Sequence, residues 1–236
     1  MTTTANRTAD RFARQLGIYN PEHRNDSVTF IGVGGIGSFA AFGAAKLGIP
    51  NITLIDPDAV EDHNIPNQFY DDTQIGEHKV EAIALHLQAH ALEPRINTWG
   101  LKLPDPDVRL SGLVVSGLDS MQARHDIWHE CIKLNPRVPR YFDARISGEF
   151  IMILAPNPTD MNDIAAYERD CLYSDEEGEE LMCTERGIID VGMQVGSLLT
   201  RMVRRHFTGE EIPKMTLFNQ NTLTPTQSDW MPVVSS

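Results

Sequence analysis

Hydrophobic and polar positions divide the beginning of the chain into three predicted elements. Residues 28–33 (VTFIGV) and 51–55 (NITLI) are short apolar runs rich in branched side chains, as is typical of buried strands. Residues 37–47, between them, are mainly small and apolar and are predicted to form a helix. A strand, a helix and a strand at this spacing form a βαβ unit, in which the strands are parallel and the crossover is right-handed.

The same patterns predict the remaining elements. Apolar positions at helical spacing predict helices over residues 76–92, 121–134 and 188–207. Short apolar runs predict strands over residues 96–101, 110–116, 141–144, 149–154 and 215–218. Residues 156–181 include the acidic run DEEGEE, so we expect an irregular, solvated loop there. Residues 219–236 are rich in Thr, Ser and Pro and are expected to form a mobile tail.

The order of these elements predicts an α/β fold of the Rossmann-like class. We expect a mostly parallel sheet flanked by helices, with an antiparallel extension at the C-terminal end. The chain contains no internal repeat and no linker-like segment, so residues 1–236 are expected to form a single domain. A long polar stretch, residues 57–74, interrupts the pattern after the second strand. Loops of that length inside a compact domain are usually functional.

A glycine-rich segment joins the first predicted strand to the first predicted helix. Its glycines are Gly32, Gly34, Gly35 and Gly37. Glycines let the backbone turn tightly and approach a phosphate, and the following helix N-terminus offers free N–H groups to that phosphate. Asp56 ends the second strand, where an acid can hydrogen-bond a ribose hydroxyl. These features predict a nucleotide site, but they do not distinguish NAD from ATP.

Further segments in chain order do distinguish the two nucleotides. They are residues 11–15 (RFARQ), 56–61 (DPDAVE), 63–68 (HNIPNQ) and 75–82 (IGEHKVEA), followed by Asp119 just past the strand 110–116. In these segments the chain resembles the ThiF/MoeB/HesA family of adenylyltransferases, which is related to the activating enzymes of ubiquitin-like proteins. The resemblance runs from Arg11 to Asp119 and continues more weakly from Cys171 to Val203.

The resemblance implies an enzyme that adenylates a carboxylate with ATP and Mg²⁺ and releases pyrophosphate. The implied substrate is the C-terminal carboxylate of a ubiquitin-like protein or peptide that ends in glycine. Such a reaction needs cations near the phosphates, a metal-binding carboxylate and close alignment of the reactants. By resemblance, Lys79 contacts the α-phosphate region and Asp119 helps to bind Mg²⁺. The alternatives are that Lys79 is an exposed helix lysine and that Asp119 caps the helix 121–134.

Other residues receive roles from the same resemblance. Asp58 joins Asp56 in flanking the ribose and adenosine, although it could equally be a turn residue. Asn64 and Gln68 would hold phosphate oxygens or order the long loop. Arg14 matches an arginine that reaches the γ-phosphate of the neighbouring subunit's ATP, which implies a homodimer with composite sites. The alternative for Arg14 is a surface arginine on an N-terminal helix.

Two departures from the family pattern, and one cysteine that matches it, matter for the chemistry. Asn67 stands where relatives often have an arginine that neutralises the β- and γ-phosphates, and an asparagine binds phosphate without charge. Cys183, ahead of the helix 188–207, resembles a cysteine that some relatives use for sulfur transfer or covalent handling of the activated carboxylate. It could instead be a buried structural thiol. Many relatives also hold zinc with two Cys-x-x-Cys pairs; Glu168 precedes Cys171 where a cysteine is needed, so we expect no structural zinc.

Composition limits the partners and the location. The formal net charge of −13 repels phosphates, so we expect no nucleic-acid partner. The N-terminal residues lack the apolar region of a signal peptide, and no run of about 18 apolar residues occurs, so we expect a cytoplasmic protein without a membrane span.

Other functions remain open on the sequence alone. The same fold could activate a small molecule or an RNA intermediate, or it could serve as a non-catalytic nucleotide-binding scaffold. A nicotinamide-dependent oxidoreductase would explain the glycine segment and Asp56, but not Lys79, Asp119 or residues 64–68.

Overall fold

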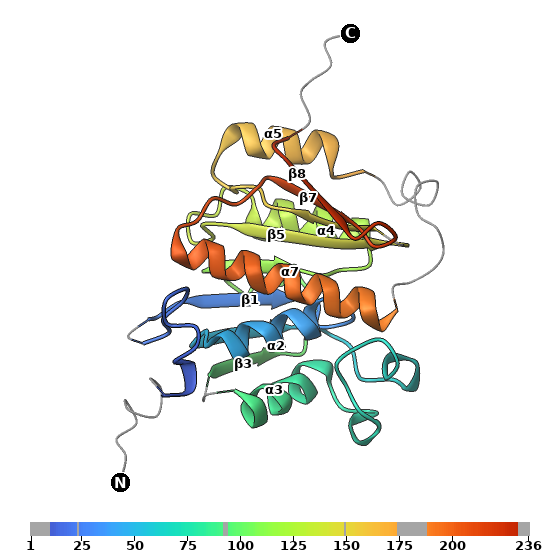
Figure 1. Cartoon of the computed structure of the whole chain (residues 1–236). Coiled ribbons are helices and arrows are strands. Elements are labelled where there is room, and N and C mark those ends of the chain that lie inside the picture. The colour runs from blue at the N-terminus through green and yellow to red at the C-terminus, as the bar shows by residue number, and fades with distance from the viewer. Residues whose placement is uncertain (1–9, 23, 92–93, 149, 174–187, 231–236) are drawn as a thin grey trace.

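An eight-stranded sheet organises the chain in the computed structural model, which describes residues 10–22, 24–91, 94–148, 150–173 and 188–230 (Figure 1). The strand order is β3-β2-β1-β4-β5-β6-β7-β8. The first five strands along the chain are parallel, and the last three extend the sheet in antiparallel fashion. Their bounds are β1 Ser27–Ile31, β2 Asn51–Ile55, β3 Arg95–Trp99, β4 Leu113–Ser116, β5 Tyr141–Ser147, β6 Phe150–Leu154, β7 Met215–Asn219 and β8 Thr224–Ser228. The predicted fold class is confirmed.

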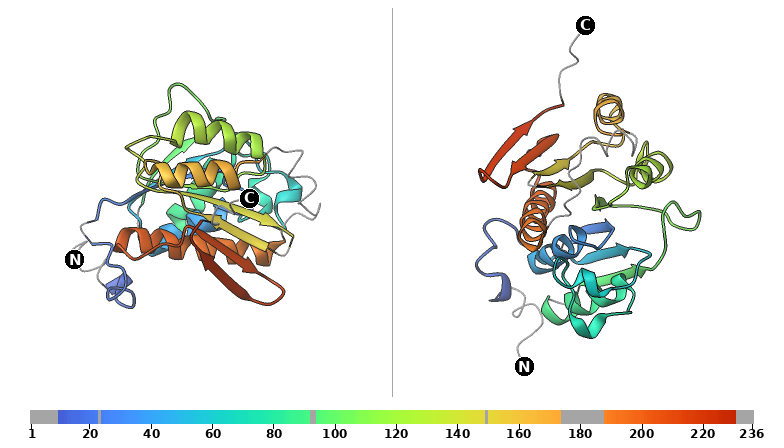
Figure 2. Two further views of the ribbon diagram at one scale, coloured as in Figure 1. Left: turned by 90° about the horizontal axis from the view of Figure 1, so that it is seen from above. Right: turned by 90° about the vertical axis from the view of Figure 1, so that its right-hand side faces the viewer.

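Helices cover both faces of this sheet (Figures 1 and 2). One face packs against α2 Gly37–Leu47, α3 Lys79–His90 and α7 Ile189–Thr208, and the other packs against α4 Met121–Ile127 and α5 Met161–Asp170. A π-helical turn, Trp128–Ile132, continues α4. Central strands are therefore buried on both faces, which is why they read as nearly continuous apolar runs in the sequence.

Alternate residues of the central strands serve two separate hydrophobic cores. Phe30 and Leu54 belong to the core beneath α2, α3 and α7, whereas their neighbours Ile31 and Ile55 belong to the core that contains Trp128. Successive side chains of a strand point to opposite faces, so one buried strand contributes to both layers. The result is a rigid three-layer frame whose loops leave from fixed strand ends.

The strand order creates a switch point between β1 and β4. From β1 the chain builds outward through β2 to β3, and it then returns to place β4 and β5 on the other side of β1. The connections after β1 and β4 therefore leave the carboxyl edge in opposite directions. In open α/β sheets such a switch point opens a crevice at the carboxyl ends of the strands, where ligands bind.

Residues 156–181 were wrongly predicted to be irregular throughout, because α5 forms within them. The helix begins after Asp160, whose side chain accepts hydrogen bonds from the backbone N–H groups of Asn162 and Asp163. An aspartate at the N-cap satisfies N–H groups that have no partner within the helix. The high charge of the surrounding segment obscured this capping signal.

The prediction of a mobile tail from Asn219 is also wrong in part, because residues 224–228 form β8. Beyond β8, Trp230 Nε1 donates a 2.8 Å hydrogen bond to Asp163 on α5. The same carboxylate pairs with Lys214, just before β7. Burial raises the pKa of Asp163, but the hydrogen bonds from Lys214 and Trp230 outweigh burial, so the pKa is lowered overall. One ionised carboxylate on α5 thus binds the residues just before and just after the β7–β8 hairpin.

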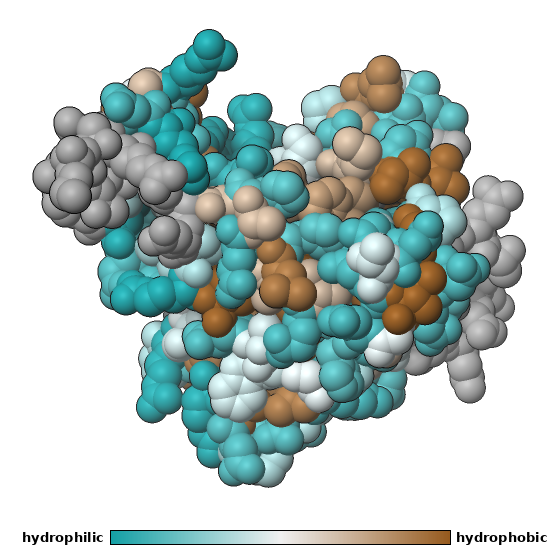
Figure 3. Space-filling view, turned by 90° about the horizontal axis from the view of Figure 1, so that it is seen from below, coloured by the Kyte–Doolittle hydropathy of each residue, from teal (hydrophilic) through white to brown (hydrophobic). Residues whose placement is uncertain are grey.

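No described helix combines the length and the apolar character that are needed to cross a bilayer. The 20-residue helix α7 carries Arg201, Arg204 and Arg205. The face of the molecule seen from below in Figure 1 is largely hydrophilic, with its apolar residues in small separate groups (Figure 3).

Candidate nucleotide-binding site

The loop after β1 turns tightly because two of its residues lack a side chain. Gly32 has a φ of +80°, and a Cβ at this position would lie 2.7 Å from the carbonyl oxygen of Gly117. A Cβ on Gly37 would lie only 1.9 Å from the carbonyl oxygen of Gly32. Both distances are far shorter than a real Cβ contact, so only glycine fits at either position. The first turn of α2 consequently starts directly at the carboxyl edge of β1.

The loop after β4 borders the other side of this glycine loop. Gly117 N–H bonds to Ile31 O at 2.9 Å, and a Cβ on Gly117 would lie 2.9 Å from the Cβ of Ile36. Asp119 follows as an exposed residue. Ser120 caps α4 through a 3.2 Å hydrogen bond from Ala123 N–H, so capping is the role of Ser120 and not of Asp119. Asp119 is therefore an exposed acid without a capping role, in the loop that leaves β4 at the switch point.

Asp56 fixes the glycine loop to the end of β2. Its Oδ2 accepts the N–H of Val33 at 2.8 Å, and its Oδ1 accepts the N–H of Asp58 at 2.9 Å. Burial raises the pKa of Asp56, and the two backbone N–H groups offset only part of that shift. The acid predicted to meet a ribose therefore lies beside the glycine loop and also shapes it.

Lys79, the first residue of α3, points its side chain back toward the chain that follows β2. Its Nζ lies 3.0 Å from Oδ2 of Asp58, with the lysine side chain 9% and the aspartate side chain 63% exposed. The backbone N–H of Lys79 also bonds to Asp58 O at 2.9 Å, and Ala59 pairs with His78 in an isolated bridge. The alternative of an exposed helix lysine is therefore wrong, and a buried cation lies near Asp56.

Two residues that the sequence analysis missed hold the long loop against the glycine loop. Tyr70 Oη donates to Val33 O at 2.7 Å and lies 3.4 Å from Lys79 O. Ser38 Oγ donates to Gly34 O at 2.6 Å and accepts the N–H of Phe69 at 3.1 Å. Ser38 could have been found, because a serine in a first helical turn readily bonds the carbonyl four residues earlier. Tyr70 carried no such local signal.

The long loop contains three amide side chains, those of Asn64, Asn67 and Gln68. One has a hydrogen-bond partner for its oxygen within the loop, and the other two have none. Asn64 Oδ1 accepts the N–H of Glu61 at 2.9 Å, so Asn64 orders the loop. The side-chain oxygens of Asn67 and Gln68 are buried without a hydrogen-bond partner. A Cβ on Gly34 would lie 3.7 Å from Oε1 of Gln68, which places that amide against the glycine loop.

Unpartnered buried polar atoms are rare in folded proteins. An amide can turn over and present either its oxygen or its NH₂ group. The side chains of Asn67 and Gln68 can therefore either donate hydrogen bonds to a polar ligand at the glycine loop or accept them from it.

Comparison with known proteins decides the family. A sequence model described as the ThiF family matches residues 19–233. The chain belongs to the ThiF family. The resemblance inferred from the motifs is thereby confirmed.

The relatives of this ThiF-family chain differ in how much of their length it covers. It is 26% identical over 199 residues to the sulfur carrier protein ThiS adenylyltransferase of Escherichia coli K12, covering 80% of this chain and 75% of that protein. It is 29% identical over 151 residues to ubiquitin-like modifier-activating enzyme 5 of Bombyx mori, covering 57% of this chain but only 38% of that protein. The longer activating enzyme therefore contains much that this alignment does not cover.

Solved structures of E. coli MccB share the fold. The complex of MccB with succinimide superposes with a TM-score of 0.74 at 18% identity, covering 97% of this chain and 72% of that chain. The complex of MccB with ATP superposes with a TM-score of 0.71 at 17% identity, covering 96% and 74%. At these identities the comparison establishes the architecture alone.

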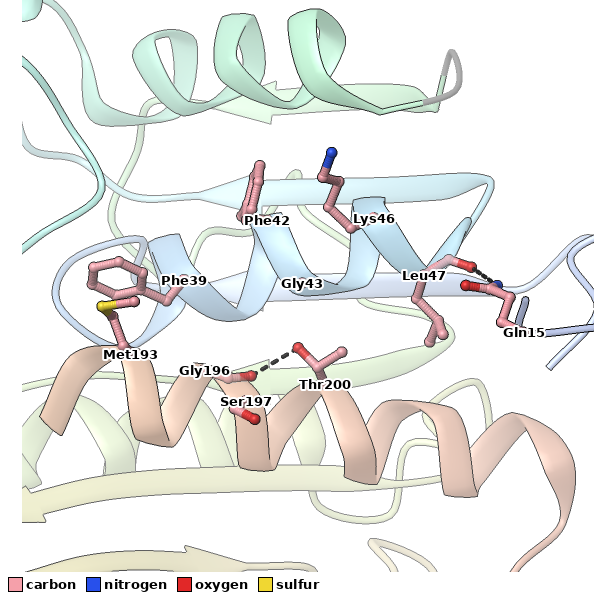
Figure 4. Close-up of a pocket in the computed structure, with 10 residues that line it drawn as sticks. All are labelled: Gln15, Phe39, Phe42, Gly43, Lys46, Leu47, Met193, Gly196, Ser197 and Thr200. Carbon is pink, nitrogen blue, oxygen red and sulfur yellow. Dashed lines mark hydrogen bonds between the residues drawn. The ribbon is translucent and has the colours of Figure 1, made fainter. Parts of the chain in front are cut away.

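Arg14 of this ThiF-family chain lies away from its own glycine loop. The next residue, Gln15, donates a 2.7 Å hydrogen bond to Leu47 O at the C-terminal end of α2 (Figure 4). The glycine loop is at the other end of α2, and a helix of 11 residues is about 16 Å long. Arg14 is exposed at that far end.

A shallow groove of ≈ 460 Å³ runs along α2 beside α7 (Figure 4). Its apolar lining comes from Phe39, Phe42 and Leu47 on α2 and from Met193 on α7. Met193 is 58% exposed, so this side of the ThiF-family chain leaves a large apolar side chain in solvent.

The cysteines give no nucleophile within the described residues. Cys183 lies outside them, so its predicted role stays a prediction. Burial raises the pKa of Cys171 to about 12 and also raises that of Cys131, which keeps both thiols protonated near neutral pH. In the described part of the chain, no three His, Cys, Asp or Glu side chains gather as they would around a metal ion.

We predict that Tyr70→Phe weakens nucleotide binding by loosening the glycine loop. The change removes the hydroxyl that holds Val33 O, so it should lower the free energy of unfolding by about 1 kcal/mol and reduce ATP affinity. Tyr19→Phe is the matched control, because it removes a 2.9 Å hydrogen bond to Asp26 at the amino end of β1. Calorimetric titration with ATP would contradict this role if Tyr70→Phe bound as tightly as Tyr19→Phe.

Proposed function

We propose that this chain is an ATP-dependent adenylyltransferase that activates the C-terminal carboxylate of a ubiquitin-like protein or peptide. The observation that carries the proposal is the set of groups around the glycine loop at the switch point. A buried lysine lies on one side of that loop, the loop that contains Asp119 borders the other side, and the amide of Gln68, whose oxygen has no partner, lies against it. A site for NAD needs no such lysine and acid.

Each residue of the proposed site has a separate role in adenylation. A carboxylate oxygen of the substrate attacks the α-phosphorus of ATP, the bond to the β-phosphate oxygen breaks, and pyrophosphate leaves. Gly34, Gly35 and the N-terminus of α2 receive the phosphates, and Lys79 offsets the charge that develops on them. Asp56 and Asp58 bind the ribose and adenosine. The carboxylate of Asp119 is a hard oxygen donor suited to Mg²⁺, which when bound would neutralise phosphate charge.

A homodimer completes the site in this proposal. An apolar groove and the exposed Met193 lie along α2 and α7, where a second copy can bury them. A two-fold axis across the middle of α2 brings the C-terminal end of one α2 beside the N-terminal end of the other. Arg14 of one copy then reaches the phosphates held by its partner. That arginine supplies the positive charge which Asn67 lacks.

The substrate class rests on the relatives' names. One relative is an adenylyltransferase of a sulfur carrier protein, and another activates a ubiquitin-like modifier. MccB has been solved with MccA. All three support a partner of protein or peptide nature, and the requirement for ATP supports a cytoplasmic location.

We predict that Lys79→Met and Asp119→Asn each lower ATP–pyrophosphate exchange by about 100-fold, because the first removes a cation beside the phosphates and the second removes a ligand for Mg²⁺. Exchange of labelled pyrophosphate into ATP is measured with ubiquitin-like proteins and peptides that end in glycine. Methionine keeps the length of Lys79, and Asp58 remains solvated without it. Asp107→Asn, an exposed acid in the loop before β4, is the control and should retain full exchange.

Two other outcomes would change the assignment. ATP binding without exchange by any of these substrates would favour the non-catalytic scaffold, which the loss of an arginine at Asn67 already suggests. Tight binding of NAD with no binding of ATP would favour an oxidoreductase.

We also predict that Arg14→Ala and Lys79→Met complement each other when mixed. Each variant alone should be nearly inactive, because every site then lacks one cation. In randomly reassociated dimers, half are mixed and each mixed dimer has one complete site, so about a quarter of wild-type exchange should return. A mixture no more active than its separate components would contradict the composite site.

A further inference from the structure

A buried ionic cluster lies beside the proposed site, on the face of the sheet that α4 and α5 cover. At its centre is Asp143 of β5, which is fully buried. Its Oδ1 accepts Nε of Arg124 at 2.9 Å. Its Oδ2 accepts Nε of Arg145 at 2.9 Å and Oη of Tyr167 at 2.8 Å. Burial raises the pKa of Asp143, but the two guanidinium groups outweigh burial and lower it, so the carboxylate stays ionised.

The charges of this cluster do not balance. Two arginines face one carboxylate, which leaves one positive charge in excess among the described residues. The side chain of Arg145 is only 9% exposed, yet its Nη1 has no hydrogen-bond acceptor. The ring of Tyr173 lies 5.6 Å from the guanidinium and covers it without accepting that N–H. Burying a charged donor without a partner is costly, so such a group is expected where an anionic ligand arrives.

The position of Arg145 indicates which ligand that is. Asp143 pairs with Ser116, the last residue of β4, so Arg145 lies past the end of β4 on the carboxyl edge. Arg124 also donates from Nη2 to the carbonyl of Leu118, next to Asp119. The cluster therefore adjoins the Asp119 loop. β5 is two strands from β1, about 10 Å, which places Arg145 on the far side of the Asp119 loop from the glycine loop that would hold the phosphates.

We propose that Nη1 of Arg145 binds the carboxylate of the acyl substrate before that carboxylate is adenylated. This inference rests on the proposed function. A carboxylate that approaches a triphosphate is repelled by it, and the excess positive charge beside Asp119 opposes that repulsion. Adenylation converts the anion into a neutral acyl group, because one oxygen is bonded to phosphorus and the other remains as a carbonyl. The attraction to Arg145 is then weaker for the product than for the substrate.

Arg145→Met separates this role from a structural one. Without Arg145, both oxygens of Asp143 keep a partner, Arg124 and Tyr167, and the cluster becomes neutral. The variant is therefore expected to fold with an unchanged or higher Tm. A structural arginine would instead give a clear loss of stability when removed.

The binding probe is N-acetylglycylglycine, a minimal glycine-ending carboxylate, and N-acetylglycylglycinamide is its uncharged counterpart. Full-length protein is first saturated with α,β-methylene-ATP and Mg²⁺, and the dissociation constant of each probe is then measured by NMR titration. We predict that Arg145→Met raises the dissociation constant of the acid at least about tenfold, since a charge-assisted hydrogen bond is lost. The amide should bind more weakly than the acid to the wild type and be insensitive to the change.

Arg140→Met is the matched control. Arg140 precedes β5 at the opposite edge of the sheet, is also partly buried, and also has a guanidinium nitrogen without a partner. Its replacement changes the net charge equally and should leave acid binding unchanged.

Several results would overturn the inference. The first is that Arg145→Met and the wild type bind the acid equally well. The second is that the wild type binds the acid and the amide equally well, or does not bind the acid at all. The third is that Arg145→Met unfolds. Failure of the wild type to bind the ATP analogue would count instead against the proposed function. If the wild type and Arg145→Met both bind the ATP analogue normally, a failure of the predicted difference in acid binding counts against the role of Arg145 alone.

Discussion

The close contact of three backbone segments at the carboxyl edge is the constraint on which the site depends. The turn after β1 fits between the ends of β2 and β4 only because Gly32, Gly37 and Gly117 carry no Cβ. Asp56 then bonds the N–H of Val33 from one side, while Gly117 bonds Ile31 from the other. This arrangement fixes the start of α2, whose N-terminal N–H groups are proposed to receive the phosphates.

The parts of the fold that local patterns determine could be predicted from the sequence. The bounds of α2 and β2 were predicted without error, because a βαβ unit has a strong periodic signal between glycine and aspartate boundaries. Helix α5 was missed because the high charge of its segment obscured its capping signal, and strand β8 was missed because Lys214 and Trp230, on either side of its hairpin, are held by Asp163, which is remote in sequence. Long-range contacts of this kind leave no periodic trace in the chain.

The candidate site shows the same division. Its glycines were proposed from their place between a strand and a helix, and Lys79 and Asp119 were proposed because they occur in family order. The packing of Tyr70 on the glycine loop and the excess charge at Arg145 were not, because both depend on side chains from separate elements meeting in the fold. The sequence shows only an arginine within a strand. That one of its guanidinium nitrogens has no hydrogen-bond acceptor is visible only in the folded structure.

Local charge resolves an apparent conflict between composition and function. The chain carries a net charge of −13, yet it is proposed to bind a triphosphate and a carboxylate together. Its overall field is unfavourable to both, so binding must come from a few cations held in a low-dielectric setting, where they act strongly. Lys79 and Arg145 are such cations, and each is more than nine-tenths buried.

Hydrogen–deuterium exchange with and without Mg²⁺ and ATP tests the central claim most directly, because it reports each loop at the switch point separately. The account predicts that ATP slows exchange of the amides in residues 33–38 and in residues 117–121 together, with β3 at the sheet edge unchanged. Protection of neither loop, or protection confined to another part of the chain, would contradict a nucleotide site between β1 and β4.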